Sequence, residues 1–158
     1  MKPLTYIMVS YTIPYMRIPE IVIDTNVLIA ALKSRRGASF RLLSVIGQTK
    51  FSINISVPLL LEYEAVAKEL IGGIVLTAED IDDILNYICS VSKWRKIFYL
   101  WRPFLKDPKD DMVLELAVTS QCNMIITYNK KDFRNVEQYF GIRVLTPQEL
   151  LLEIGEVS

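Results

Sequence analysis

Short runs of branched apolar residues alternate with longer amphipathic segments along this chain, and this alternation restricts its possible folds most strongly. The apolar runs lie at residues 21–23, 52–57, 123–127 and 143–145. Runs of this length are typical of buried strands, and the longer segments between them have helical periodicity. The pattern predicts an α/β domain in which helices flank a central, mainly parallel β-sheet.

Capping residues locate the expected helices. Pro58 suits the first turn of a helix that ends near Gly72, and Thr77 with Asp80 resembles a capping box. Thr146-Pro147-Gln148-Glu149 combines a cap, a first-turn proline and a capping-box glutamate. We expect helices over residues 27–32, 58–71, 77–91 and 111–121, another from Thr146, and no assigned element over 93–106.

The chain has 158 residues, which fits one ordinary domain. We assign residues 20–158 to this domain and residues 1–19 to an N-terminal extension, poorly ordered or an over-called start with the working protein beginning near Met16. Polar residues and Pro14 interrupt the apolar extension, and no small-x-small cleavage site follows, so we do not interpret it as a signal peptide. No apolar run is long enough to span a bilayer, so no membrane association is expected.

Composition excludes several kinds of chemistry. There is no histidine, which removes Ser-His-Asp hydrolysis, histidine acid–base catalysis and imidazole-containing zinc sites. Eighteen basic residues balance eighteen acidic ones, so the whole chain is not a polybasic nucleic-acid or membrane-surface protein. Cys89 and Cys122 are too far apart in sequence for a C-x-x-C clip and indicate free thiols in a reducing cytoplasm. Any catalysis must therefore depend on carboxylates.

Acidic residues follow the predicted strands at the edge where parallel sheets bind ligands. Asp24 ends the first apolar run, and Asn129 and Asp132 follow the run that ends near Thr127. Further acids lie before or within the first turns of helices that start at the same edge. These are Glu62, Glu64, Asp107, Asp110 and Asp111.

Converging carboxylates repel one another unless a proton or a cation intervenes. Oxygen ligands without His or Cys select Mg²⁺ or Mn²⁺, and such an ion can activate water toward a phosphodiester. The pattern therefore indicates metal-assisted phosphodiester hydrolysis. Aspartates also cap helices, so a purely structural role is the competing interpretation for Asp111 and Asp132. Periodicity alone does not decide between Glu62 and Glu64, which flank the apolar stripe of their helix on opposite sides.

Four motifs in order resemble those of PIN-domain nucleases, and within them a VapC-like, toxin-related branch. The first is Ile-Val-Ile-Asp24-Thr25-Asn26, followed by the Ser-Arg-Arg-Gly37 loop. The second is Pro58-Leu-Leu-Leu-Glu62, and the third runs from Asp107 through Asp111 to Ala117. The fourth is Ile-Thr127-Tyr-Asn129-Lys-Lys-Asp132-Phe133, and Arg143 to Leu150 also matches. The resemblance covers roughly residues 20 to 152.

This resemblance implies a PIN fold and a Mg²⁺- or Mn²⁺-dependent endoribonuclease that hydrolyses single-stranded RNA. It favours Glu62 over Glu64, and it assigns Asp107 and Asp110 to shaping the loop. Asn129 replaces an aspartate that many relatives carry, which leaves the fourth acid and a second metal open. The resemblance places catalytic and metal-binding roles on Asp24, Glu62, Asp111 and Asp132, and orienting or substrate roles on Thr25, Asn26, Thr127 and Asn129.

The resemblance also implies partners: an RNA substrate, a cognate antitoxin protein and a second copy of the chain in a homodimer. Six basic residues between Lys93 and Lys109 are interleaved with aromatic residues, which suits single-stranded RNA. A second basic cluster is Lys33, Arg35, Arg36 and Arg41. The alternative function is a non-catalytic PIN-like module that binds RNA or a protein without cleaving it.

Overall fold

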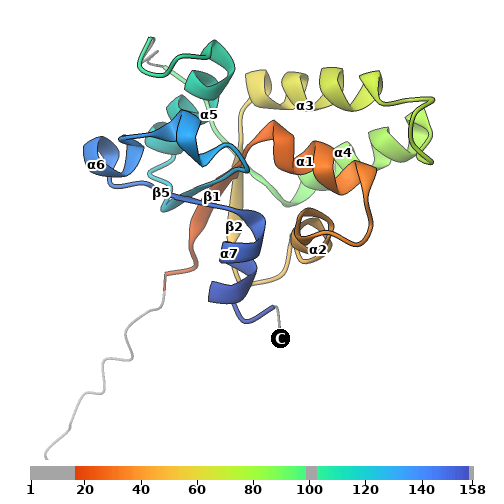
Figure 1. Ribbon diagram of the computed structural model, residues 1–158, viewed down its shortest axis with the longest axis horizontal. Helices are drawn as coiled ribbons and strands as arrows, with labels where there is room; N and C mark the ends of the chain where they lie inside the picture. The colour runs from red at the N-terminus through yellow and green to blue at the C-terminus, as the bar shows by residue number, and fades with distance from the viewer. Residues whose placement is uncertain (1–16, 99–102, 157–158) are drawn as a thin grey trace, which may run out of the picture.

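A parallel sheet forms the centre of the fold. The structure is a computed structural model that describes residues 17–98 and 103–156. Within these residues the strands are β1 (Glu20–Ile23), β2 (Ser52–Ile55), β3 (Lys93–Trp94), β4 (Met124–Ile126) and β5 (Arg143–Leu145). They form one sheet in the order β3-β2-β1-β4-β5, and every neighbouring pair is parallel (Figure 1). The predicted α/β class is confirmed, whereas the extension up to Met16 lies outside the described residues.

Helices cover both faces of this sheet (Figure 1). Helix α5 packs against β1, β2 and β4, while α7 packs against β5 and α2, and α2 packs against α1. Within the described residues the helices are α1 (Thr25–Lys33), α2 (Ala38–Ser44), α3 (Val57–Glu69), α4 (Ala78–Val91), α5 (Pro108–Thr119), α6 (Val136–Phe140) and α7 (Pro147–Glu153), with a 3-10 turn, η1, at Lys130–Phe133.

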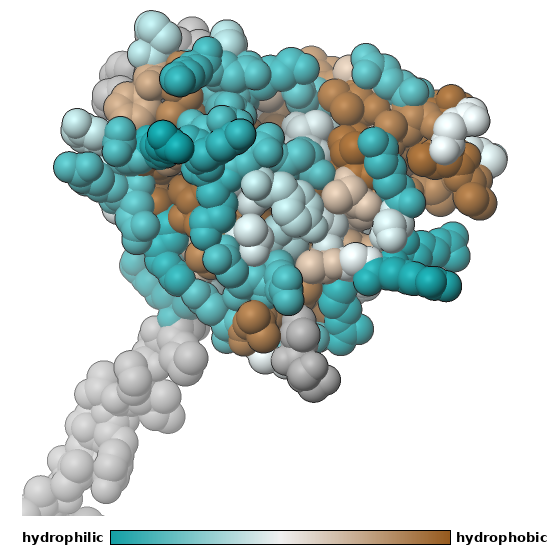
Figure 2. All heavy atoms as spheres, viewed as in Figure 1, coloured by the Kyte–Doolittle hydropathy of each residue, from teal (hydrophilic) through white to brown (hydrophobic). Residues whose placement is uncertain are grey.

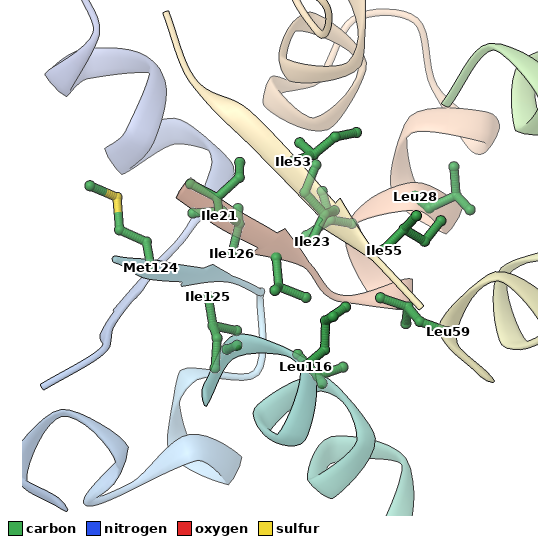
Figure 3. Close-up of a cluster of buried hydrophobic side chains, with 14 of the residues drawn as sticks. Ile21, Ile23, Leu28, Ile53, Ile55, Leu59, Leu116, Met124, Ile125 and Ile126 are labelled. Atoms are coloured by element: carbon green, nitrogen blue, oxygen red, sulfur yellow. The ribbon is translucent and has the colours of Figure 1, made fainter. Parts of the chain in front are cut away.

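The central strands β1 and β4 are almost entirely apolar because both of their faces are covered. Ile21, Ile125 and Ile126 are completely buried, and they belong to one continuous hydrophobic core. Figure 3 shows Ile125 and Leu116 of α5 together on one side of the sheet, and Ile53 on the opposite side. The sheet and its two helical layers therefore hold the ends of β1 and β4 in fixed positions.

The predicted capping residues begin the helices as expected. Thr77 with Asp80 and Thr146 with Glu149 each form a complete capping box, in which both reciprocal hydrogen bonds are present. Helix α5, in contrast, begins at Pro108 and not near Asp111. The side chain of Asp107 accepts a hydrogen bond from the Lys109 amide at 2.9 Å, which starts the helix earlier.

The sequence did not predict several short elements. Helices α2 and α6, the turn η1 and the two-residue strand β3 are too short for a clear periodic signal, and they are stabilised by packing on longer neighbours. In the part of the chain that the structure describes, no helix is long and apolar enough to cross a membrane.

Both cysteines are free thiols. Burial raises the pKa of Cys122 to about 12, so this thiol stays protonated beside the Asn54 amide in the interior of the sheet. Cys89 is only partly buried. The predicted absence of a disulfide is consistent with both positions.

The core packing leads to a stability prediction. Leu114 is completely buried in α5, so Leu114→Ala leaves a cavity between this helix and the sheet. We expect the free energy of unfolding, measured by urea denaturation, to fall by about 2–5 kcal/mol. Leu152→Ala, an exposed position on α7, is the matched control and should change it by less than about 0.5 kcal/mol. Equal effects of the two variants would contradict this core assignment.

Candidate active site

A buried carboxylate, Asp24, lies where β1 ends and α1 begins. Its side chain is only 7% exposed. Asp24 Oδ2 accepts hydrogen bonds from Thr127 Oγ1 at 2.7 Å and from Asn26 Nδ2 at 3.0 Å. The Thr25 amide also hydrogen-bonds the carboxylate. A buried charge requires such partners, so these groups fix the orientation of Asp24.

Thr127, directly after β4, connects the ends of the two central strands. Its buried hydroxyl donates to Asp24 and accepts from Asn26 Nδ2 at 3.1 Å and from the Asn129 amide at 3.0 Å. Asn26 Oδ1 in turn accepts from the Tyr128 amide at 3.2 Å. The structure therefore brings the predicted orienting residues together: Asn26 and Thr127 through side chains, and Thr25 and Asn129 through backbone amides.

Neighbouring acids act on the ionisation of Asp24. Burial raises its pKa above the ordinary value of 3.8, and the hydrogen bonds from Thr127 and Thr25 partly oppose this rise. The negative charges of Glu62 and Asp132 raise the pKa further. Residues from α3 and η1 thus lie near the carboxylate at the end of β1.

Asp110, in the first turn of α5, belongs to the same group of acids. Burial raises its pKa to about 6, and the charges of Asp24, Asp107, Asp132 and Asp111 contribute to that rise. The resemblance to PIN-domain nucleases gave Asp110 the role of shaping the loop. The Asp107-Pro108 pair could have indicated the role of Asp110 from the sequence. A capping aspartate and a first-turn proline begin the helix at Pro108 and not at Asp111, which changes the aspartate that faces the sheet edge.

The adjacent residue, Asp111, has a different environment. Its side chain is 2% exposed, and Oδ1 accepts hydrogen bonds from the amides of Leu105 at 2.8 Å and Phe104 at 3.3 Å. This carboxylate therefore anchors the segment that precedes α5. The structure places Asp111 near Asp110, but it uses Asp111 Oδ1 to hold the backbone.

The two glutamates of α3 point in different directions. Glu62 Oε1 lies 3.3 Å from Lys109 Nζ in α5, and Glu62 is close enough to raise the pKa of Asp24. Glu64 instead pairs with Lys68 one turn later on the same helix. This geometry favours Glu62, the residue that the motif also favours, as the acid of α3 that faces the site.

Asp132 approaches the site from η1 and is exposed to solvent. Its amide donates to the Asn129 carbonyl at 2.9 Å, which closes the turn after β4. Its charge raises the pKa of both Asp24 and Asp110. The side chain also lines a hollow of about 470 Å³ with Phe104, Lys106 and Arg134.

The donor chemistry of this group fits a hard divalent cation. All candidate ligands are carboxylates, and two of them have pKa values raised partly by other acids of the group, a repulsion that a cation relieves. Across residues 17–98 and 103–156, however, no three acidic or cysteine side chains lie close enough to form a ready-made metal site. An ion would therefore have to draw these side chains closer together.

The sequence profile of the PIN domain matches residues 20–131, which include Asp24, Glu62, Asp110 and Asp111. The chain belongs to the PIN-domain family. Asp132 lies just beyond the matched range. No curated protein matches the sequence.

The fold is shared with solved structures that include two VapBC proteins. A chain of VapBC2 from Rickettsia felis, bound to a DNA fragment from its promoter, is 13% identical, with a TM-score of 0.53 over 79% of this chain and 96% of that one. A chain of VapBC-1 from nontypeable Haemophilus influenzae is 14% identical, with a TM-score of 0.56 over 82% of this chain and 98% of that one. At these identities the likeness shows a common PIN fold.

The raised pKa of Asp110 predicts how stability depends on pH. Asp110 is half-protonated near pH 6 in the folded state and near its ordinary pKa of 3.8 when unfolded, so the folded protein binds more protons between these values. Its contribution to stability is therefore fully present below about pH 4 and is lost as the pH rises through 6. Asp110→Asn should raise the melting temperature at neutral pH and weaken its fall between acid and neutral pH.

Differential scanning fluorimetry of the metal-free protein at a series of pH values checks this expectation. Asp83→Asn, at an exposed position on α4, is the matched control and should leave the wild-type pH profile unchanged. If Asp110→Asn has the same profile as the wild type, Asp110 does not carry the raised pKa.

Proposed function

We propose that this protein is a Mg²⁺- or Mn²⁺-dependent endoribonuclease that hydrolyses phosphodiester bonds in single-stranded RNA, as the toxin of a toxin–antitoxin pair. Membership of the PIN-domain family supports a nuclease. The observation that carries the proposal is that Asp24 after β1, Asp110 in α5 and Asp132 in η1 influence one another: burial and the charges of the other two acids raise the pKa of Asp110 to about 6. Without a cation, the electrostatic repulsion among these carboxylates destabilises the folded protein.

We assign the metal to Asp24, Asp110 and Asp132, with Glu62 as the further acid. We prefer Asp110 to the sequence-predicted Asp111 because Asp111 Oδ1 accepts hydrogen bonds from two backbone amides. Metal binding through the other oxygen of Asp111, Oδ2, stays a prediction. Mg²⁺ or Mn²⁺, when bound, would supply the positive charge that activates the attacking water and stabilises the ribose oxygen that leaves the phosphorus. Thr127 and Asn26 hold Asp24 in place, and Lys109 balances the charge of Glu62.

Some of the basic residues that could bind RNA have partners within the protein, and others are exposed. Lys93 pairs with Glu20, and Arg95 donates a hydrogen bond to Asn54 Oδ1 at 2.8 Å. Both side chains therefore bind residues of the neighbouring strands β1 and β2. Tyr99 and Trp101, two aromatic residues of the predicted RNA-binding segment between Lys93 and Lys109, lie outside the described residues. Arg35 and Arg36 are exposed in the loop between α1 and α2, which supports this loop as an RNA contact.

Substitution of Asp24 tests the activity. Asp24→Asn removes a charge that a cation would need, so RNA cleavage should fall at least about 100-fold, while the melting temperature of the metal-free protein stays equal or rises because repulsion with Glu62 and Asp132 is relieved. The assay uses a labelled single-stranded RNA with Mg²⁺, Mn²⁺ or EDTA. Asp83→Asn is the matched control and should cleave like the wild type.

Added Mg²⁺ separates this proposal from the non-catalytic alternative. Millimolar Mg²⁺ should raise the melting temperature of the wild type and leave that of Asp24→Asn nearly unchanged. A non-catalytic module predicts equal shifts in both proteins and no cleavage with either metal. An Asp24→Asn protein that fails to fold would show that Asp24 has a structural role.

An antitoxin is the partner that the similarity to the VapBC structures suggests. A hollow of about 910 Å³ between α1, α2 and α4 offers a surface for it, lined by apolar side chains including Leu43, Val75 and Ile84. Figure 2 shows hydrophobic residues gathered on the side where the segment after α3 approaches α1. We propose that an amphipathic helix of the antitoxin fills this hollow. The homodimer stays a prediction from the resemblance.

Val75 allows a test of this surface because it is 95% exposed, so its substitution leaves the core intact. Val75→Asp should weaken binding of the protein encoded by the adjacent reading frame at least about 10-fold, since a charge would be buried against an apolar helix. Leu152→Asp, an exposed position on α7, is the control. Titration calorimetry measures both affinities, and an unchanged affinity for Val75→Asp would place the partner elsewhere.

A further inference from the structure

Tyr128 is a half-exposed aromatic residue held rigidly beside the candidate active site. The residue is 45% exposed, and its hydroxyl forms a hydrogen bond of 2.7 Å with Ser39 Oγ, which is buried at the start of α2. Its amide donates to Asn26 Oδ1 at 3.2 Å. Both ends of the residue are therefore anchored, and part of the ring remains open to solvent.

The anchors of Tyr128 fix its place relative to the acids. Thr127, the preceding residue, donates to Asp24, and Asn26 also donates to the same carboxylate oxygen. On the other side, Ser39 follows the loop that carries the exposed residues Arg35 and Arg36. The ring thus lies between the acidic group at the end of β1 and the basic loop between α1 and α2.

We propose that Tyr128 is a stacking platform for a nucleobase of single-stranded RNA next to the cleaved phosphate. This inference rests on the proposed function and identifies one residue that binds its substrate. Aromatic rings stack on unpaired bases, and cations nearby bind the adjoining phosphates. Because Ser39 satisfies the hydroxyl and holds the ring, little conformational entropy is lost when a base stacks on it.

Binding assays in the Asp24→Asn background test the platform without cleavage. Tyr128→Leu keeps an apolar side chain but loses the aromatic face, and it should weaken binding of a fluorescein-labelled single-stranded RNA about 5- to 100-fold in fluorescence anisotropy. Tyr128→Phe keeps the ring and should stay within about 5-fold of the parent protein. The stacking role therefore predicts that removing the ring weakens RNA binding, whereas removing the hydroxyl alone does not.

Tyr87→Leu is the matched control. The Tyr87 side chain is 50% exposed on α4, and its hydroxyl donates to the Ile46 carbonyl at 2.8 Å, so its environment is like that of Tyr128. It should leave RNA affinity unchanged. If Tyr128→Leu and Tyr87→Leu bind RNA as tightly as the parent protein, the stacking role is wrong while RNA binding itself still stands.

A scan of abasic positions along the RNA provides a second measurement that does not require the Tyr128 variants to fold. One missing base should weaken binding to the Asp24→Asn protein about 5- to 100-fold, and missing bases elsewhere along the RNA should have less effect. A uniform response along the RNA would overturn the platform. If the Asp24→Asn protein binds no single-stranded RNA at all, the proposed function fails together with this inference.

Discussion

The burial of the Asp24 carboxylate is the constraint on which the rest of the site depends. A charge that is 7% exposed at the end of a central strand is stable only if polar partners or a cation compensate it. Thr127 and Asn26 supply two hydrogen bonds, and in doing so they join the loops that follow β1 and β4. The same contacts position Tyr128, because its amide binds the Asn26 side chain. The fold thus positions the site residues because β1 and β4 are neighbours in the sheet and the residues that follow them meet at the same edge.

The sequence predicted the sheet because parallel strands covered on both faces are continuous apolar runs. The runs around Ile21 and Ile125 became β1 and β4, which are neighbours in the sheet. Both capping boxes also formed, since they depend only on residues three positions apart. Strand β3 was not predicted, because its two residues have no local periodicity and pair with β2 through tertiary context.

The site was predictable where it follows strand ends and unpredictable where a helix orients adjacent acids. Asp24, Asn26 and Thr127 meet as the motifs implied. Successive residues on a helix point about 100° apart, so whether Asp110 or Asp111 faces the other acids depends on where α5 begins. Asp107 sets that start, and the amides of Phe104 and Leu105 then donate to Asp111 Oδ1. The position of Tyr128 beside the site could not be predicted from the sequence, because Ser39, which binds its hydroxyl, is 89 positions away along the chain.

Anomalous diffraction from crystals soaked in Mn²⁺ tests the central claim most directly. We expect a manganese ion at the carboxyl edge of the sheet, coordinated by Asp24 and Asp110, while Asp111 keeps its hydrogen bonds from the two backbone amides. A manganese ion bound without contact to Asp24, or soaked crystals with no peak at this edge, would contradict it.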